Sequence, residues 1–109
     1  NRKDLYSDNT KTFVIGEVKN ISSAVRKVEL KVITSNIKYK HTNLLNDRLV
    51  VVNIGSNCKF IDNNGKEIDF DDISFYDTVQ IYVKENNIDD TQKENLNGVK
   101  VVLKNQYQK

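Results

Sequence analysis

The chain has 109 residues, of which 38% are hydrophobic and 29% are charged, and its formal net charge is +2. This length predicts one domain that buries roughly two-thirds of its unfolded surface without the help of a disulfide or a metal. No apolar run approaches the roughly 18 residues of a membrane-spanning helix, and a net charge this small does not by itself indicate nucleic-acid binding. The single cysteine, Cys58, excludes an intramolecular disulfide and a multi-cysteine zinc site.

Charge is distributed unevenly along the chain. Residues 1–61 contain 11 Lys/Arg against 5 Asp/Glu, residues 62–94 contain 3 against 10, and residues 95–109 contain 3 against none. This distribution predicts either a basic and an acidic side that organise a partner, or two solvated faces that keep the domain soluble. Residues 1–11 are polar and aperiodic, so we expect a tether that leads to a domain displayed outside the membrane, with a cytoplasmic location as the alternative.

The first strand is predicted from Thr12 onward by alternation of apolar and polar residues. Phe13 and Ile15 would share one face of this strand, and Val14, Gly16 and Val18 the other. A glycine inside a strand predicts a bulge or a sharp bend, which small barrels need at their corners. Residues 20–24 are then expected to form a turn.

The second strand is predicted over residues 25–35, where Val28, Leu30 and Val32 alternate with charged side chains. Residues 36–47 show no clean period and predict a long loop. One helical turn could form within this loop, at residues 42–45.

A third strand is predicted over residues 48–54, with a break at residues 55–57 and a renewed extension over residues 58–62. Cys58 alternates with Phe60 in that extension, so we expect a small half-buried strand residue there and not a nucleophile.

An acidic segment follows, and residues 60–77 contain six Asp/Glu. Asn and Gly at residues 63–65 predict a turn, since both tolerate positive φ, and residues 66–68 would return as a short strand arm. A helical corner is expected near residues 69–76, with Asp69 as its N-cap. Three apolar side chains of this corner would plug one end of the barrel: Phe70, Ile73 and Phe75.

Two more strands are predicted, over residues 78–84 and 99–105. Between them, residues 85–98 form a polar loop that would turn at Asn97-Gly98, and residues 106–109 are expected to fray. The inward positions of the two strands would be Val79, Ile81, Val83, Val99, Val101 and Leu103.

Together these elements predict an all-β fold: a small five-stranded OB-like barrel over residues 12–105 with one short helical corner. The stretch FIDNNGKEIDFDDISFYDTVQIYV, residues 60–83, resembles a motif of OB-fold-like domains in small secreted or lipid-anchored bacterial proteins of unknown function. The matching positions are Ile61, Gly65, Lys66, Ile68, Phe70, Asp72, Ile73, Asp77, Val79 and Ile81. The resemblance covers most of residues 11–103 and implies the barrel and an envelope location, but no catalytic residues.

One position departs from this motif, because Tyr76 stands where those domains usually have glycine. The acidic segment also offers oxygen donors of the kind that calcium prefers. However, the EF-hand pattern needs a complete series of ligands, and this segment supplies only its first fragment. We therefore expect no metal and no cofactor, and assign these carboxylates to turns and caps.

The one basic and aromatic cluster of the sequence lies around residues 27–41, where OB barrels commonly bind single strands. Glu29 interrupts its basic row. With one histidine and one cysteine and no Gly-rich phosphate loop, we expect no enzyme. The expected function is a non-catalytic binding or assembly module of the cell envelope, for an envelope protein or an extracellular ligand. The alternative is a single-stranded nucleic-acid binder. The candidate binding residues are Lys27, Lys31, Lys38, Tyr39, Lys40, His41 and Tyr82.

Overall fold

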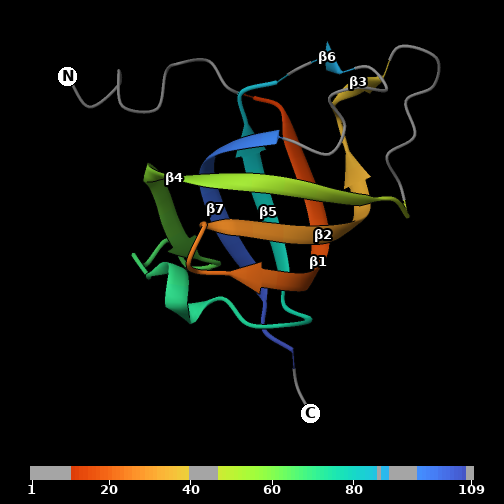
Figure 1. The fold of residues 1–109 in the computed structure, drawn as a ribbon. Helices are drawn as coiled ribbons and strands as arrows, with labels where there is room; N and C mark the ends of the chain where they lie inside the picture. The colour runs from red at the N-terminus through yellow and green to blue at the C-terminus, as the bar shows by residue number, and fades with distance from the viewer. Residues whose placement is uncertain (1–10, 40–46, 86, 89–95, 108–109) are drawn as a thin grey trace.

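Five strands close into a barrel in the order β1-β2-β4-β7-β5 in the computed structural model of the chain (Figure 1). The structure describes residues 11–39, 47–85, 87–88 and 96–107. The barrel strands are β1 (Phe13–Ser22), β2 (Lys27–Ser35), β4 (Leu49–Asp62), β5 (Thr78–Val83) and β7 (Leu96–Asn105). β4 and β7 pair in parallel, and the other neighbours are antiparallel. This closure confirms the predicted five-stranded all-β barrel, and the arrangement is consistent with an OB-like fold.

Three short elements complete the described part of the chain. The 3-10 turn η1 (Phe70–Asp72) lies between β4 and β5. β3 (Lys38–Tyr39) and β6 (Asn87–Ile88) form a separate parallel pair near one end of the barrel (Figure 1). Both lie in segments that were expected to be loops. The helical turn expected at residues 42–45 lies outside the described residues.

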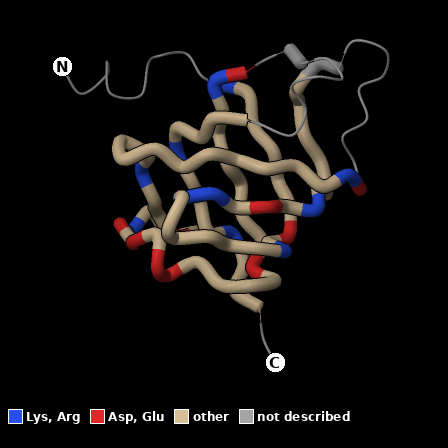
Figure 2. Tube along the Cα trace, viewed as in Figure 1, with Lys and Arg blue, Asp and Glu red and all other residues tan. Residues whose placement is uncertain are grey.

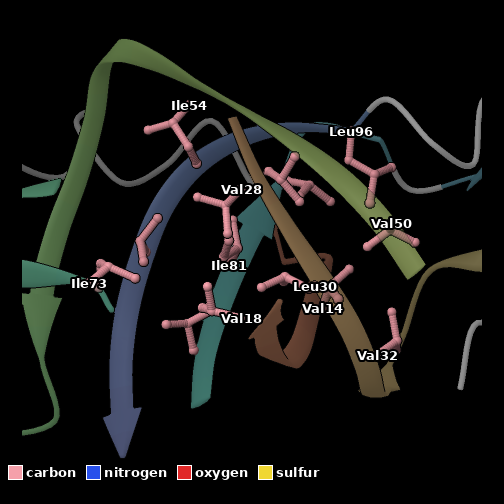
Figure 3. Close-up of a cluster of buried hydrophobic side chains, with 14 of the residues drawn as sticks. Val14, Val18, Val28, Leu30, Val32, Val50, Ile54, Ile73, Ile81 and Leu96 are labelled. Atoms are coloured by element: carbon pink, nitrogen blue, oxygen red, sulfur yellow. The ribbon is translucent and has the colours of Figure 1, made fainter. Parts of the chain in front are cut away.

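The barrel interior is filled by aliphatic side chains that alternate along the strands (Figure 3). Leu30, Ile81 and Leu96 have no exposed surface. Burial of such side chains removes apolar surface from water, at roughly 25 cal/mol per Å². The predicted inward positions are confirmed for Val79, Ile81, Val83, Val101 and Leu103. On the first two strands, the face shared by Val14 and Val18 and the face shared by Val28, Leu30 and Val32 are the buried ones.

Gly16 lies at a bulge, as its position within a strand predicted. The pairing of β1 with β2 shifts register between Ile15 and Gly16. A Cβ at Gly16 would lie 2.7 Å from the backbone oxygen of Lys31 and 3.0 Å from the Cβ of Leu30. The absence of a side chain therefore lets β1 approach β2 where the barrel wall bends.

β4 is longer than expected, because residues 55–57 do not end the strand. It runs without a break through 14 residues, and only its pairing with β7 lapses between Ile54 and Lys59. The first half of β4 also pairs with β2. The backbone stays extended while the strand turns a corner of the barrel, so the glycine at this position marks a lapse in pairing and not a strand end.

The turn between β1 and β2 lies later than residues 20–24. β1 continues to Ser22, and Val25 is 61% exposed instead of starting the next strand. The turn ends at Arg26, which has a φ of 52°. Its backbone oxygen accepts a hydrogen bond from the amide of Ile54 (2.8 Å), and its Nε donates to the backbone oxygen of Ile54 (3.1 Å). These two hydrogen bonds to Ile54 of β4 fix the position of the turn relative to that strand.

The start of β7 was also predicted wrongly, since Asn97 and Gly98 lie inside the strand and form no turn. The Glu85 carboxylate accepts hydrogen bonds from the Asn97 backbone N–H (2.9 Å) and side-chain amide (2.7 Å), which holds Asn97 extended. The pairing of β5 with β7 then slips by one residue between Tyr82 and Val83. As a result Val99 is only half-buried, while Leu96 enters the core.

The acidic segment begins with the predicted turn, in which Gly65 has a φ of 85°. The Asp62 carboxylate accepts hydrogen bonds from the backbone amides of Asn64 (2.8 Å) and Lys66 (2.9 Å), which closes the turn. The expected strand arm is reduced to one bridge between Glu67 and Ile61.

At η1, Asp69 is the N-cap residue as predicted, and its backbone N–H donates to the Asp72 carboxylate (2.8 Å). Phe70 and Ile73 are buried and close this end of the barrel. Phe75 does not, because it is 50% exposed. The chain turns outward before Tyr76, whose φ of 72° lies in the left-handed region that favours glycine. This is also the position at which the chain departs from the sequence motif, which usually has glycine there.

Candidate functional site

The predicted binding residues on β2 lie on the outer surface of the barrel. Lys27 and Lys31 are exposed, with half-buried Glu29 between them, and Figure 2 shows this order of basic, acidic and basic segments along β2. On the neighbouring strand β4, Lys31 is paired with Leu49 and Glu29 with Val51. The described part of this surface therefore combines charges of both signs with aliphatic side chains.

Lys38 and Tyr39 form β3, and their backbones pair with Asn87 and Ile88 of β6. Lys40 and His41 lie outside the described residues.

Tyr82 lies on β5 and is half-buried on the outer face, as its outward position predicted. Its ring contacts Phe13 edge-on, with 6.1 Å between the ring centroids and an interplanar angle of 64°. The ammonium group of Lys100 lies 5.3 Å from the centroid of the Tyr82 ring. The Gln80 side-chain amide also donates a hydrogen bond to the Tyr82 hydroxyl (3.3 Å). These contacts hold the ring in one orientation.

The barrel register extends this group across four strands. Phe13 of β1 is paired with Tyr82 of β5, Tyr82 with Lys100 of β7, and Lys100 with Lys59 of β4. We call these four residues the Tyr82 row. The row combines an aromatic half with two neighbouring lysines. Sequence reasoning identified only Tyr82, because Lys59 and Lys100 are neighbours solely through the parallel pairing of β4 with β7.

A pocket adjoins the basic end of the Tyr82 row. It has a volume of about 570 Å³ and is lined by Lys59, Phe60, Ile61, Gly65, Glu67 and Lys100. Two lysines and one glutamate therefore line one concave surface, and the Lys100 ammonium group lies over the Tyr82 ring. Such an arrangement suits a ligand that has an anionic group, further hydrogen-bonding groups and a face that can pack on an aromatic ring.

Three of the six acidic side chains that resembled metal ligands bind backbone amides. Asp62 closes the turn after β4, Asp72 binds the amide of Asp69, and Asp77 binds two further amides, those of Ser74 and Tyr107 (each 2.8 Å). Among the described residues, no three His, Cys, Asp or Glu side chains lie close enough together to hold a metal ion. None of the described helical segments is long and apolar enough to span a membrane.

Cys58 is half-buried against the core, and its Sγ lies 3.8 Å from the backbone oxygen of Lys59. Burial raises the pKa of the thiol to about 11, and the nearby charge of Arg26 opposes this only in part. The thiol is therefore protonated at neutral pH, whereas the thiolate is the reactive form. The folded protein holds the thiol proton more tightly than the unfolded chain does, because its thiol pKa is higher. The contribution of Cys58 to the free energy of unfolding is therefore fully present below the ordinary thiol pKa of 9.0, and it decreases as the pH rises from there to about 11.

We predict that the rate of Cys58 alkylation by iodoacetamide rises about tenfold per pH unit from pH 7 to 10 without levelling off, because it follows the thiolate fraction. The urea-unfolded chain is the control, and its rate should level off near the ordinary thiol pKa of 9.0. Stopped samples analysed by mass spectrometry give both rates. A plateau near pH 9 in the folded protein would contradict the raised pKa.

Comparison with known proteins identified no matching family model, no matching curated protein and no matching solved structure.

Proposed function

We propose that this barrel is a non-catalytic binding module of the bacterial cell envelope that holds an anionic ligand at the Tyr82 row and its pocket. The observation that carries the proposal is the pairing of Lys59 with Lys100 beside an oriented Tyr82 ring, at the edge of a pocket of about 570 Å³. Two ammonium groups attract a carboxylate or phosphate, and an aromatic face packs on a sugar ring or another flat group.

An acidic oligosaccharide fits this arrangement best. OB barrels bind both oligosaccharides and oligonucleotides. Single-stranded nucleic acid is bound by several aromatic rings that follow the strand and stack successive bases. In the Tyr82 row the second ring, Phe13, meets Tyr82 edge-on, so the row offers one stacking platform. Glu67, which lines the pocket, can accept hydrogen bonds from sugar hydroxyls.

The resemblance of residues 60–83 to secreted or lipid-anchored domains supports the envelope location. A non-catalytic role is supported by the protonated thiol of Cys58 and by the turn and capping bonds of Asp62, Asp72 and Asp77. The alternative nucleic-acid surface would use Lys27, Lys31, Lys38, Tyr39 and Lys40. Glu29 lies between the first two of these lysines and opposes phosphate binding there.

The proposal is tested by NMR titration of the ¹⁵N-labelled domain with an oligogalacturonate, with neutral maltohexaose as the uncharged probe. We expect saturable shifts at the amides of Lys59, Tyr82 and Lys100 with the acidic probe only. The double variant Lys59→Gln/Lys100→Gln should weaken binding at least about tenfold, because it removes both cations. The matched control is Lys27→Gln/Lys31→Gln, which should bind as the wild-type chain does.

Titration of the same labelled domain with oligothymidylate, at low and high salt, tests the nucleic-acid alternative. Salt-sensitive shifts that are lost in Lys27→Gln/Lys31→Gln would establish the nucleic-acid alternative and reject the Tyr82 row. Absence of shifts with the oligogalacturonate would reject the anionic glycan as well. The envelope location is tested separately, by labelling intact bacterial cells with an antibody against the domain.

A further inference from the structure

Three large aromatic side chains cluster on the surface near η1. Phe75, Tyr76 and Tyr107 are 50%, 45% and 51% exposed. The ring centroids of Phe75 and Tyr76 are 6.3 Å apart, and those of Tyr76 and Tyr107 are 5.2 Å apart. We call these three residues the aromatic cluster. Contiguous exposed aromatic surface of this kind typically marks an interaction site, whereas single exposed side chains do not.

A left-handed backbone conformation and two hydrogen bonds fix the backbone of Tyr76 and Tyr107 in the aromatic cluster. Tyr76 is turned outward by its φ of 72°, and its amide donates to the backbone oxygen of Val18 on β1 (2.8 Å). Asp77, only 2% exposed, accepts a hydrogen bond from the amide of Tyr107 (2.8 Å), which places that residue beside Tyr76. The cluster is therefore preformed, and a ligand would meet ordered rings at a low entropic cost.

The surroundings of the aromatic cluster are acidic. Residues 67–77 contain five Asp/Glu and no Lys or Arg, and Asp71 and Asp72 are exposed. Figure 2 shows acidic segments gathered at this end of the barrel. Lys19 contacts the cluster, since its ammonium lies 5.2 Å from the Tyr76 centroid and 2.7 Å from the Glu17 carboxylate. This contact shows that the cluster accommodates an ammonium group on a ring face, and Glu17 balances the charge of Lys19.

From these observations we propose that the aromatic cluster docks a basic segment of a partner protein. Arginine or lysine side chains of that segment would lie on the faces of Phe75 and Tyr107, within reach of the carboxylates of Asp71 and Asp72. Aromatic faces attract cations through their quadrupole, and the acidic surroundings add long-range attraction. The same carboxylates would repel nucleic acid. The cluster is separate from the Tyr82 row, so this proposal does not depend on the proposed function.

An NMR titration of the ¹⁵N-labelled domain with the peptide Gly-Arg-Gly-Arg-Gly-Arg-Gly-amide tests the proposal, with the glutamate version of the peptide as the charge control. We expect saturable shifts at the amides of residues 74–77 and 107 with the arginine peptide only, reduced by salt. The variant Phe75→Ser/Tyr107→Ser should weaken binding about tenfold or more, because it removes two ring faces. The matched control is Ile33→Ser/Leu49→Ser, which alters two equally exposed apolar residues elsewhere and should bind normally.

A second variant keeps the test valid if the double variant does not fold. Tyr76→Gly removes the central ring at a position whose φ suits glycine, and we expect it to fold and to bind weakly. Equal shifts with the glutamate peptide, or arginine-peptide binding that survives both variants, would overturn the proposal. Shifts at residues 74–77 that depend on protein concentration without peptide would also overturn it and assign the surface to a second copy of the chain.

Discussion

Replacing Asp77 by alanine is expected to lower the free energy of unfolding by about 3 kcal/mol, because two charge-assisted hydrogen bonds are lost at a buried site. The carboxylate is 2% exposed and accepts hydrogen bonds from the backbone amides of Ser74 and Tyr107. Its own backbone oxygen accepts a further bond from the amide of Val18 (2.9 Å). Asp77 thus connects three segments of the chain, the turn before β5, the middle of β1 and the residues after β7.

Urea denaturation measures this loss, and Asp71→Ala is the matched control. Asp71 is an exposed carboxylate six residues earlier in the chain, so its replacement should change stability by no more than about 0.5 kcal/mol. Asp77→Asn should fall between the two, because an amide oxygen can replace only one of the two acceptors. A similar stability of Asp77→Ala and Asp71→Ala would show that water satisfies the two amides and that the buried carboxylate contributes little.

The substitution Gly16→Ala is expected to cost about 2 kcal/mol, because a methyl group must be inserted into a closely packed strand pair. The new Cβ would lie 2.7 Å from the Lys31 backbone oxygen and 3.0 Å from the Leu30 Cβ. Both atoms belong to a strand that is itself paired on its other side with β4, so neither can move without disturbing a second strand pair. A larger residue such as valine should cost more.

Two other glycines provide graded controls for Gly16. Gly55 has no atom within 4 Å of its would-be Cβ, so Gly55→Ala should be within about 0.5 kcal/mol of the wild-type chain. A Cβ at Gly98 would meet side-chain atoms of Ile81, Val52 and Ile54 at 3.1–3.3 Å, a looser approach than the 2.7 Å to backbone at Gly16. We therefore expect Gly98→Ala to be intermediate. If thermal unfolding gives equal midpoints for Gly16→Ala and Gly55→Ala, the bulge has more room than the structure indicates.

In the acidic segment, hydrogen bonds between residues close in the sequence were predicted correctly, whereas a hydrogen bond between distant residues was not. The turn at Gly65 and the capped 3-10 turn after Asp69 were predicted correctly, because their hydrogen bonds join residues only two to four positions apart. The burial of Asp77 was not predicted, because one of its partners, Tyr107, is 30 residues away. Phe75 looked like a core residue by spacing alone, but the left-handed turn at Tyr76 leaves its ring exposed.

The candidate binding surface shows the same division. Alternation correctly assigned Tyr82 to the outside of β5. It could not show that Phe13, Lys59 and Lys100 lie in the same row, because that depends on three strand pairings between distant segments. The two predicted lysines on β2 are exposed as expected, yet they lie beside Leu49 and Glu29 rather than beside aromatic rings.

The sequence by itself determined that this protein is an all-β barrel, which side chains share a strand face and where the turns of the acidic segment lie. These properties are encoded in consecutive residues, through the two-residue period of strands and the conformational preferences of Gly, Asn and Asp. The tertiary structure alone decided the register of the strands, the one-residue slip at Val99 and the grouping of outward side chains into the Tyr82 row and the aromatic cluster. Closing the barrel pairs residues that are far apart in the chain, and a change in register by one residue moves a side chain to the other face of the sheet.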